Sequence, residues 1–242
     1  MITAQKSAWF ERLFALYNRH LIWRKFTGLR VAGLKDLCAA RAENIPLVLY
    51  ANHSSWWDGL MAFQVGHSCR LEQYMMMEEQ QLRTHTLFRK LGAFSVTREN
   101  AREALRSVNY ASASLRGTTR VLWIFPQGMT QANDIRPLTL YTGAARIIER
   151  MGVADTAPVA LRYEFQDDFR PEAFVRLGRF ERITVDENFD AKHLTHRFTE
   201  ALTGTLDRLR ADVLTNNLEE YCEIVAVRRR RRQRTGTLRV ED

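Results

Sequence analysis

Cysteine is scarce in this chain, and the few that occur form no pattern. Among 242 residues only Cys38, Cys69 and Cys222 are cysteine, an odd number placed far apart. A disulfide framework or a zinc site would need cysteines at characteristic short spacings. We therefore expect three reduced thiols, no metal site and a reducing compartment.

Long apolar runs are missing as well. No stretch approaches the roughly 20 apolar residues with which a helix crosses a bilayer. The N-terminal residues lack the apolar core and small-residue cleavage site of a secretory signal, so we expect none. Hydrophobic residues nevertheless make up 45% of the chain, a composition that favours a packed core over disorder.

Acidic residues are few at both ends, which concentrates positive charge there. Of the formal net charge of +8, residues 1–35 carry +6, residues 228–242 carry +5 and the middle carries −3. Basic ends around a slightly acidic body predict an anionic partner, either a membrane surface or a nucleic acid. The arginine block at 227–234 has no nucleic-acid-binding signature beside it. We therefore rank membrane lipids first and expect no nucleic acid partner.

Residues 7–27 combine helical spacing of apolar side chains with basic residues. Four cations lie among them, and a tryptophan stands near each end. This composition is typical of an amphipathic helix lying in a membrane interface, whereas an ordinary helix that covers the core is the alternative. The apolar positions are Phe10, Leu13, Phe14, Tyr17, Leu21 and Trp23.

Short apolar runs alternate with helical patterns through the rest of the chain. Residues 47–51 and 120–125 are nearly continuous apolar runs, typical of strands buried on both faces of a sheet. The predicted fold is therefore α/β, with a mostly parallel or mixed central sheet covered by helices. Further strands are expected at 29–34, 71–77, 93–97, 158–165 and 174–183, and helices at 35–44, 59–66, 79–91, 99–116, 138–151 and 190–226.

The run at 47–51 delivers a histidine to its carboxyl end. His53 follows shortly after the run, and Asp58 comes five residues later, a spacing that one face of a regular helix does not bring together. The side chains meet only if the chain turns between them. Asp58 would then orient the imidazole and stabilise its protonated form, so that His53 can deprotonate a hydroxyl. A structural histidine near a helix cap is the alternative, and the pair alone favours it.

Three downstream stretches change that balance. GAFSVTR spans 92–98, FPQGMT spans 125–130 and APVAL spans 157–161. Together with NHSSWWD at 52–58, they resemble the four motifs of the glycerolipid acyltransferase family, which includes glycerol-3-phosphate and lysophosphatidate acyltransferases. Each later motif is weak alone, whereas all four in order are a specific signal.

The resemblance implies a reaction and a role for each matching residue. The family transfers a fatty acyl group from acyl-CoA or acyl-carrier protein to a hydroxyl, without a covalent acyl-enzyme and without a cofactor. In its HX4D motif His53 would be the general base and Asp58 its partner. Arg98 would hold an acceptor phosphate, and Asn52 and Gly128 would belong to the acceptor site. We expect a glycerophosphate or lysophospholipid acceptor, as in phospholipid biosynthesis.

The third motif departs from the family pattern F-P-E-G-T-R at two positions. Gln127 replaces glutamate and keeps hydrogen bonding without the charge, and Thr130 replaces arginine, which removes a phosphate contact. We keep both in the acceptor site; Arg120 or Arg136 could replace the missing cation. Two alternatives stay open: acylation of a lipid hydroxyl without a phosphate monoester, such as a glycolipid or glycosylated terpenoid, and a non-catalytic lipid-binding protein.

These observations divide the chain into three expected parts. Residues 1–34 form a membrane-associating segment, residues 35–227 an acyltransferase domain and residues 228–242 an arginine-rich tail. The basic ends predict a peripheral protein on the cytoplasmic face of a membrane.

Overall fold

The computed structural model describes residues 1–40, 44–98, 100–166 and 168–226. The strands within these ranges are β1 (Gly28–Ala32), β2 (Leu47–Ala51), β3 (Gln73–Glu78), β4 (Ala93–Val96), β5 (Val121–Ile124), β6 (Val153–Glu164), β7 (Glu172–Leu177), β8 (Glu181–Thr184) and β9 (Tyr221–Ala226). The helices are α1 (Ala8–Lys25), α2 (Leu34–Ala39), α3 (Asp58–Ser68), α4 (Glu79–Thr84), the 3-10 helix η1 (Thr86–Leu91), α5 (Ala101–Leu115), α6 (Gly143–Met151) and α7 (Ala191–Leu214).

All the described strands join one sheet. Its order is β4-β3-β5-β2-β6-β7-β1-β9, and β8 pairs with β6 outside this path. The neighbours from β4 to β6 are parallel, as are β7 and β1. The pairs β6–β7, β6–β8 and β1–β9 are antiparallel. A mixed, mostly parallel sheet flanked by helices confirms the predicted fold class.

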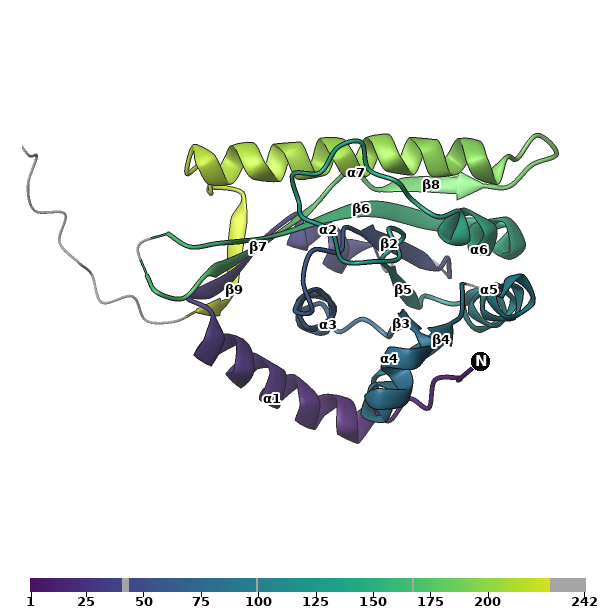
Figure 1. Ribbon diagram of the computed structural model, residues 1–242, viewed down its shortest axis with the longest axis horizontal. Helices are drawn as coiled ribbons and strands as arrows, with labels where there is room; N and C mark the ends of the chain where they lie inside the picture. Colours follow the sequence, from purple (N-terminus) through teal and green to yellow (C-terminus); the bar gives the residue numbers. More distant parts are fainter. Residues whose placement is uncertain (41–43, 99, 167, 227–242) are drawn as a thin grey trace, which may run out of the picture.

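Helices cover both faces of the sheet, with α7 along one side and α1 along the other (Figure 1). The alternation of side chains along β2 explains the two layers. Val48 and Tyr50 enter a core shared with α5, α6 and α7, whereas Leu47 and Leu49 enter a core shared with α1, α2 and α3. A strand buried on both faces must be apolar at every position, as this one is.

Five of the expected elements are wrong in their extent. The helix expected at 138–151 begins only at Gly143, and the strand expected at 158–165 begins already at Val153. The helix expected at 190–226 ends at Leu214, passes through Gly204 without interruption, and is followed by the edge strand β9. The strand expected at 174–183 is two strands, β7 and β8. The helix expected at 79–91 is divided into α4 and η1 at His85. β9 forms by pairing with β1, which is distant in sequence. The breaks between β7 and β8 and between α4 and η1 are short and local. The periodic pattern of apolar residues reveals neither kind of feature.

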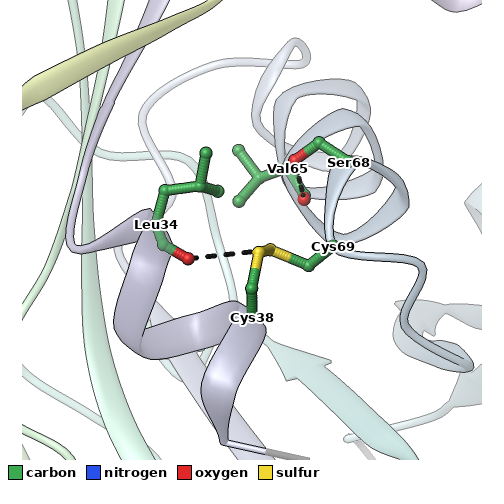
Figure 2. The surroundings of a disulfide bond; sticks show 5 residues. All are labelled: Leu34, Cys38, Val65, Ser68 and Cys69. Carbon is green, nitrogen blue, oxygen red and sulfur yellow. Dashed lines mark hydrogen bonds between the residues drawn. A yellow bond between two sulfur atoms is a disulfide. The ribbon is translucent and has the colours of Figure 1, made fainter.

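The expectation of three reduced thiols is also wrong. Cys38 on α2 and Cys69 at the end of α3 form a disulfide, with their Cα atoms 4.9 Å apart (Figure 2). Cys222 is a free, exposed cysteine. The two cysteines are 31 residues apart, a separation that matches no short-spacing rule. They meet because α2 and α3 pack on the same face of the sheet, which the sequence does not show. The disulfide removes the argument for a reducing compartment.

The two basic ends differ in what the structure describes. β1, which falls in the segment 1–34, is paired within the sheet, and α1 packs against α3. Residues 228–242 lie outside the described residues. In the described ranges no helix is both long and apolar enough to cross a bilayer.

Candidate active site

The loop between β2 and α3 brings His53 and Asp58 together. β2 ends at Ala51 and α3 begins at Asp58, and the turn between them places His53 Nδ1 2.8 Å from Asp58 Oδ2. The backbone N–H groups of Ser54 and Ser55 donate to the same oxygen at 2.6 and 2.8 Å. The loop is therefore folded around a carboxylate that has no exposed surface.

Tyr163 on β6 completes this group and was not singled out from the sequence. Its Oη donates a hydrogen bond of 2.6 Å to Asp58 Oδ1. Burial raises the pKa of Tyr163 well above its ordinary value, and the charge of Asp58 and this hydrogen bond add to the rise. The phenol stays protonated at neutral pH, so both oxygens of Asp58 have donors. The only signal in the sequence was a tyrosine two residues after the APVAL motif.

This arrangement leaves one ring nitrogen of His53 available. Because a carboxylate only accepts hydrogen bonds, we assign the imidazole proton to Nδ1, beside Asp58. Nε2 is then the atom that can take a proton from another molecule. The side chain of His53 is 23% exposed, and its ring lies 4.9 Å from that of Phe125.

Asn52 lies behind the pair and joins two strands. Its Nδ2 donates to Asn133 Oδ1 at 2.7 Å and to the carbonyl of Leu161 at 3.0 Å. Its Oδ1 accepts from the Leu161 N–H at 2.7 Å. Asn52 is 2% exposed, so in this geometry it holds the ends of β2 and β6 together and does not reach an acceptor.

Gln127 likewise contacts the protein. Its Oε1 accepts from the backbone N–H of His53 at 2.6 Å, and its Nε2 donates to Gln131 Oε1 at 2.9 Å. The Gln131 N–H donates in turn to the carbonyl of His53 at 2.8 Å. Both backbone groups of His53 are thereby tied to the loop that carries FPQGMT. The side chain at 127 positions the histidine.

Arg98 and Gly128 meet at the other side of this loop. The guanidinium donates to the carbonyl of Gly128, lies 5.6 Å from the ring centre of Tyr141 and lies 3.9 Å from Glu78 Oε1. Gly128 has a φ of 72°, which an L-residue rarely adopts. Thr130, two residues after Gly128, is exposed.

A cavity of about 950 Å³ joins these groups. His53, Arg98, Gly128 and Thr130 line it together with the cations Arg146 and Arg150 and the aromatic Tyr141. Its apolar lining includes Phe14, Leu60, Phe63, Met75, Phe88 and Leu91. The ring of Phe14 lies 5.1 Å from that of Phe63 and 6.2 Å from that of Phe88, so α1, α3 and η1 share this wall. A cavity lined by both charged and apolar side chains suits an amphiphilic substrate.

The two arginines considered as replacements at the third motif lie elsewhere. Arg120 pairs with Glu72, and Arg136 pairs with Asp207. Neither lines the cavity. Arg146, on α6, does line it, although it pairs with Glu149 at 2.9 Å.

Comparison with known proteins gives one informative match. The model of the family described as Acyltransferase matches residues 29–162. No curated protein matches the chain. A solved structure of the pilus retraction motor PilT with bound ADP is 8% identical and aligns with 74% of this chain and 57% of its own length, at a TM-score of 0.31. That likeness is too low to carry an argument.

Proposed function

This chain belongs to the acyltransferase family, and we propose that it transfers a fatty acyl group from acyl-CoA or acyl-carrier protein to a hydroxyl of a glycerophosphate or lysophospholipid. The observation that carries the proposal is the hydrogen-bonded group of His53, Asp58 and Tyr163 at the wall of a large cavity. The group has the geometry of a general base, His53, whose protonated form is stabilised by the carboxylate of Asp58.

His53 acts as the base in this reaction. Its Nε2 takes the proton of the acceptor hydroxyl while the hydroxyl oxygen attacks the thioester carbonyl. The C–S bond then breaks, and the leaving sulfur receives the proton from His53. One proton thus moves from the acceptor oxygen to the departing thiol, and the protein carries no acyl group. A base in this position contributes roughly 10²–10⁴ in rate.

Asp58 and Tyr163 support the base. The buried carboxylate stabilises the imidazolium that forms when Nε2 takes a proton, and the tyrosine and two backbone N–H groups keep the carboxylate oriented. Gln127 holds the backbone N–H of His53, and Asn52, the residue before it, is tied to β6 at Leu161. We assign these two residues to positioning, not to the acceptor contact expected from the sequence.

The cavity divides into parts suited to the two halves of a lipid substrate. The apolar wall shared by α1, α3 and η1 would hold an acyl chain. Arg98, beside Gly128 and Thr130, would hold the acceptor phosphate with its remaining N–H groups while the carbonyl of Gly128 keeps the guanidinium in place. The acyl donor and acceptor are the only small-molecule partners that this mechanism requires, and no cofactor is needed.

A second candidate acceptor is a lipid hydroxyl without a phosphate monoester, such as a glycolipid. It is favoured by Thr130, an exposed hydroxyl where the family pattern has a cation. The exchange at Gln127 does not favour a non-catalytic lipid-binding protein, because that side chain contacts His53 and Gln131 instead of a substrate.

We further propose that the protein binds peripherally to a membrane surface through α1. Phe14, one of the expected positions, is turned inward, whereas Leu13, Tyr17 and Trp23 are exposed as expected. This outer face of α1 consists of Trp9, Leu13, Leu16, Tyr17 and Trp23, which are between 47% and 69% exposed. Apolar and aromatic side chains beside basic ones are typical of a helix in a membrane interface.

The test of catalysis is an acceptor screen with a radiolabelled acyl thioester, with products identified by mass spectrometry. We expect transfer to a glycerophosphate or lysophospholipid by the wild type, and none by His53→Ala. His193→Ala, which removes an exposed histidine on α7, is the control. Full activity in folded His53→Ala would refute the assignment.

The membrane proposal has a separate test. Deleting residues 1–27 would also remove Ile22, which is fully buried in the core, so substitutions are preferable. Leu13→Gln with Leu16→Gln changes only exposed side chains. The double variant should move from the membrane pellet to the supernatant while its melting temperature is unchanged.

A further inference from the structure

A second cavity, of about 300 Å³, lies between α1 and α3. It is lined by Arg12, Ala15, Leu16, Arg19, Gln64 and His67. We propose that this cationic pocket binds the phosphate of an anionic phospholipid headgroup while the outer face of α1 rests on the bilayer. The inference rests on the proposed membrane association and adds to it a defined site on the protein.

The two arginines of the pocket have no acidic partner among the residues that the structure describes. Arg12 and Arg19 are seven residues apart on α1, two helical turns, and therefore project from the same side. Over the described ranges of the chain, neither side chain makes an ion pair or a hydrogen bond. Most arginines on the strands form ion pairs with acidic residues, and Arg98 in the larger cavity is paired with Glu78. Two unpaired guanidiniums facing one pocket provide bidentate donors for a phosphate.

Gln64 contributes a neutral donor whose direction is fixed. Asn18 is fully buried, and its Nδ2 donates to the carbonyl of Leu60 at 2.9 Å and to Gln64 Oε1 at 3.2 Å. Because the Leu60 carbonyl can only accept, the orientation of both amides follows. The Gln64 oxygen is thereby occupied, and its Nε2 has no acceptor among the residues that the structure describes. Gln64 is 6% exposed as a residue and lines the pocket, so its Nε2 can donate to a group bound there.

The position of the pocket favours a lipid headgroup. Leu16, on its rim, is 69% exposed and belongs to the outer face of α1. If that side chain enters the acyl region, the arginines one turn before and after it lie at the level of the headgroups. His67, whose ring stacks on Phe63 at 5.9 Å, faces the pocket from α3. A phosphate there would be contacted from two helices.

The experiment measures binding of the full chain to phosphatidylcholine vesicles with and without phosphatidylglycerol. Diffuse attraction should lose about fivefold in partition coefficient for each cation removed near the surface. An arginine that hydrogen-bonds a phosphate directly should lose at least about tenfold. We therefore expect Arg12→Gln with Arg19→Gln to lose about 100-fold on phosphatidylglycerol vesicles.

Arg24→Gln with Lys25→Gln is the matched control, because it removes the same charge from the same helix outside the pocket. We expect a loss of about 25-fold. Equal losses in the two pairs would show diffuse attraction only and would overturn the pocket. Gln64→Glu keeps the acceptor for Asn18 but places a carboxylate beside the arginines, so the gain from phosphatidylglycerol should disappear.

Two further outcomes separate this inference from the proposals on which it depends. A wild type that binds no vesicle of either composition would refute membrane association as well. A wild type that binds inorganic phosphate without vesicles, and gains nothing from phosphatidylglycerol, would assign the pocket to a soluble anion and overturn the headgroup. His53→Ala should bind vesicles like the wild type, so loss of catalysis leaves the test unaffected.

Discussion

Substituting Gly128 tests whether Arg98 is held where an acceptor phosphate would lie. A methyl group on residue 128 would overlap Arg98 Nη1 and come within 2.7 Å of the Tyr141 ring. The arginine can move, since its end is mobile about several bonds, but it must then leave the carbonyl of Gly128. Gly128→Ala therefore displaces the guanidinium without removing it.

The loss of stability expected in Gly128→Ala has two parts, the cost of the backbone conformation and the loss of the hydrogen bond to Arg98. A second glycine separates them. Gly117 has a φ of 68°, close to the 72° of Gly128, but a methyl group there would meet nothing within 4 Å. Each alanine costs roughly 1–2 kcal/mol for the left-handed backbone. Gly128→Ala should lose about 1–2 kcal/mol more, because a partly exposed, charge-assisted hydrogen bond is broken. Gly117→Ala thus measures the backbone term alone.

The assay is acyl transfer to 1-acylglycerol-3-phosphate, with stability measured by urea denaturation. A loss of 1–2 kcal/mol in phosphate binding corresponds to a rise in KM of roughly 5- to 30-fold. We expect this rise in Gly128→Ala, with little change in kcat, and none in Gly117→Ala. Equal KM values in the two variants would refute the placement of the phosphate at Arg98.

Three other predictions follow from single contacts. Cys38→Ser should lower the free energy of unfolding by roughly 3–4 kcal/mol, the loop-closure value for a 31-residue separation, measured by denaturation without reductant. Tyr163→Phe should lower kcat/KM about tenfold, because Asp58 loses a donor, whereas Tyr50→Phe, a buried hydroxyl away from Asp58, should not. The ion pair with the arginine four residues along lowers the pKa of Glu79 to about 2. The ionised form is favoured in the folded state, so Glu79 stabilises the fold above pH 4.5, and this contribution should fade between pH 4.5 and 2 and be absent in Glu79→Gln.

The sequence predicted the parts of the fold that depend on local pattern. The apolar runs at 47–51 and 120–125 became the adjacent strands β2 and β5 because a strand buried on both faces has few other compositions. β9 was missed, since at residues 221–226 only Tyr221 and Val225 are buried and the strand forms by pairing with β1, far away in the chain. Edge pairing of this kind is decided by tertiary contacts and not by propensity.

In the candidate site, too, the sequence predicted the contact between residues close in the chain and not the one between distant residues. The contact between His53 and Asp58 needs only the short loop between them, and the motif spacing indicated it. Tyr163 reaches Asp58 across 105 residues, and its partner is set by the register of β2 against β6, which pairs Tyr50 with Pro158. A tyrosine in an apolar strand shows its partner only after that register is known.

The exchange at position 127 is explained by its neighbour in space. Gln127 accepts from the N–H of His53, as the oxygen of a glutamate would, but its other end donates to Gln131. A glutamate at 127 would instead need Gln131 to reverse its amide and donate. The two glutamines are therefore a matched pair that holds the loop against His53. It follows that the loss of charge at 127 says little about the acceptor, and that in the proposed reaction Arg98 and the hydroxyl of Thr130 would recognise it.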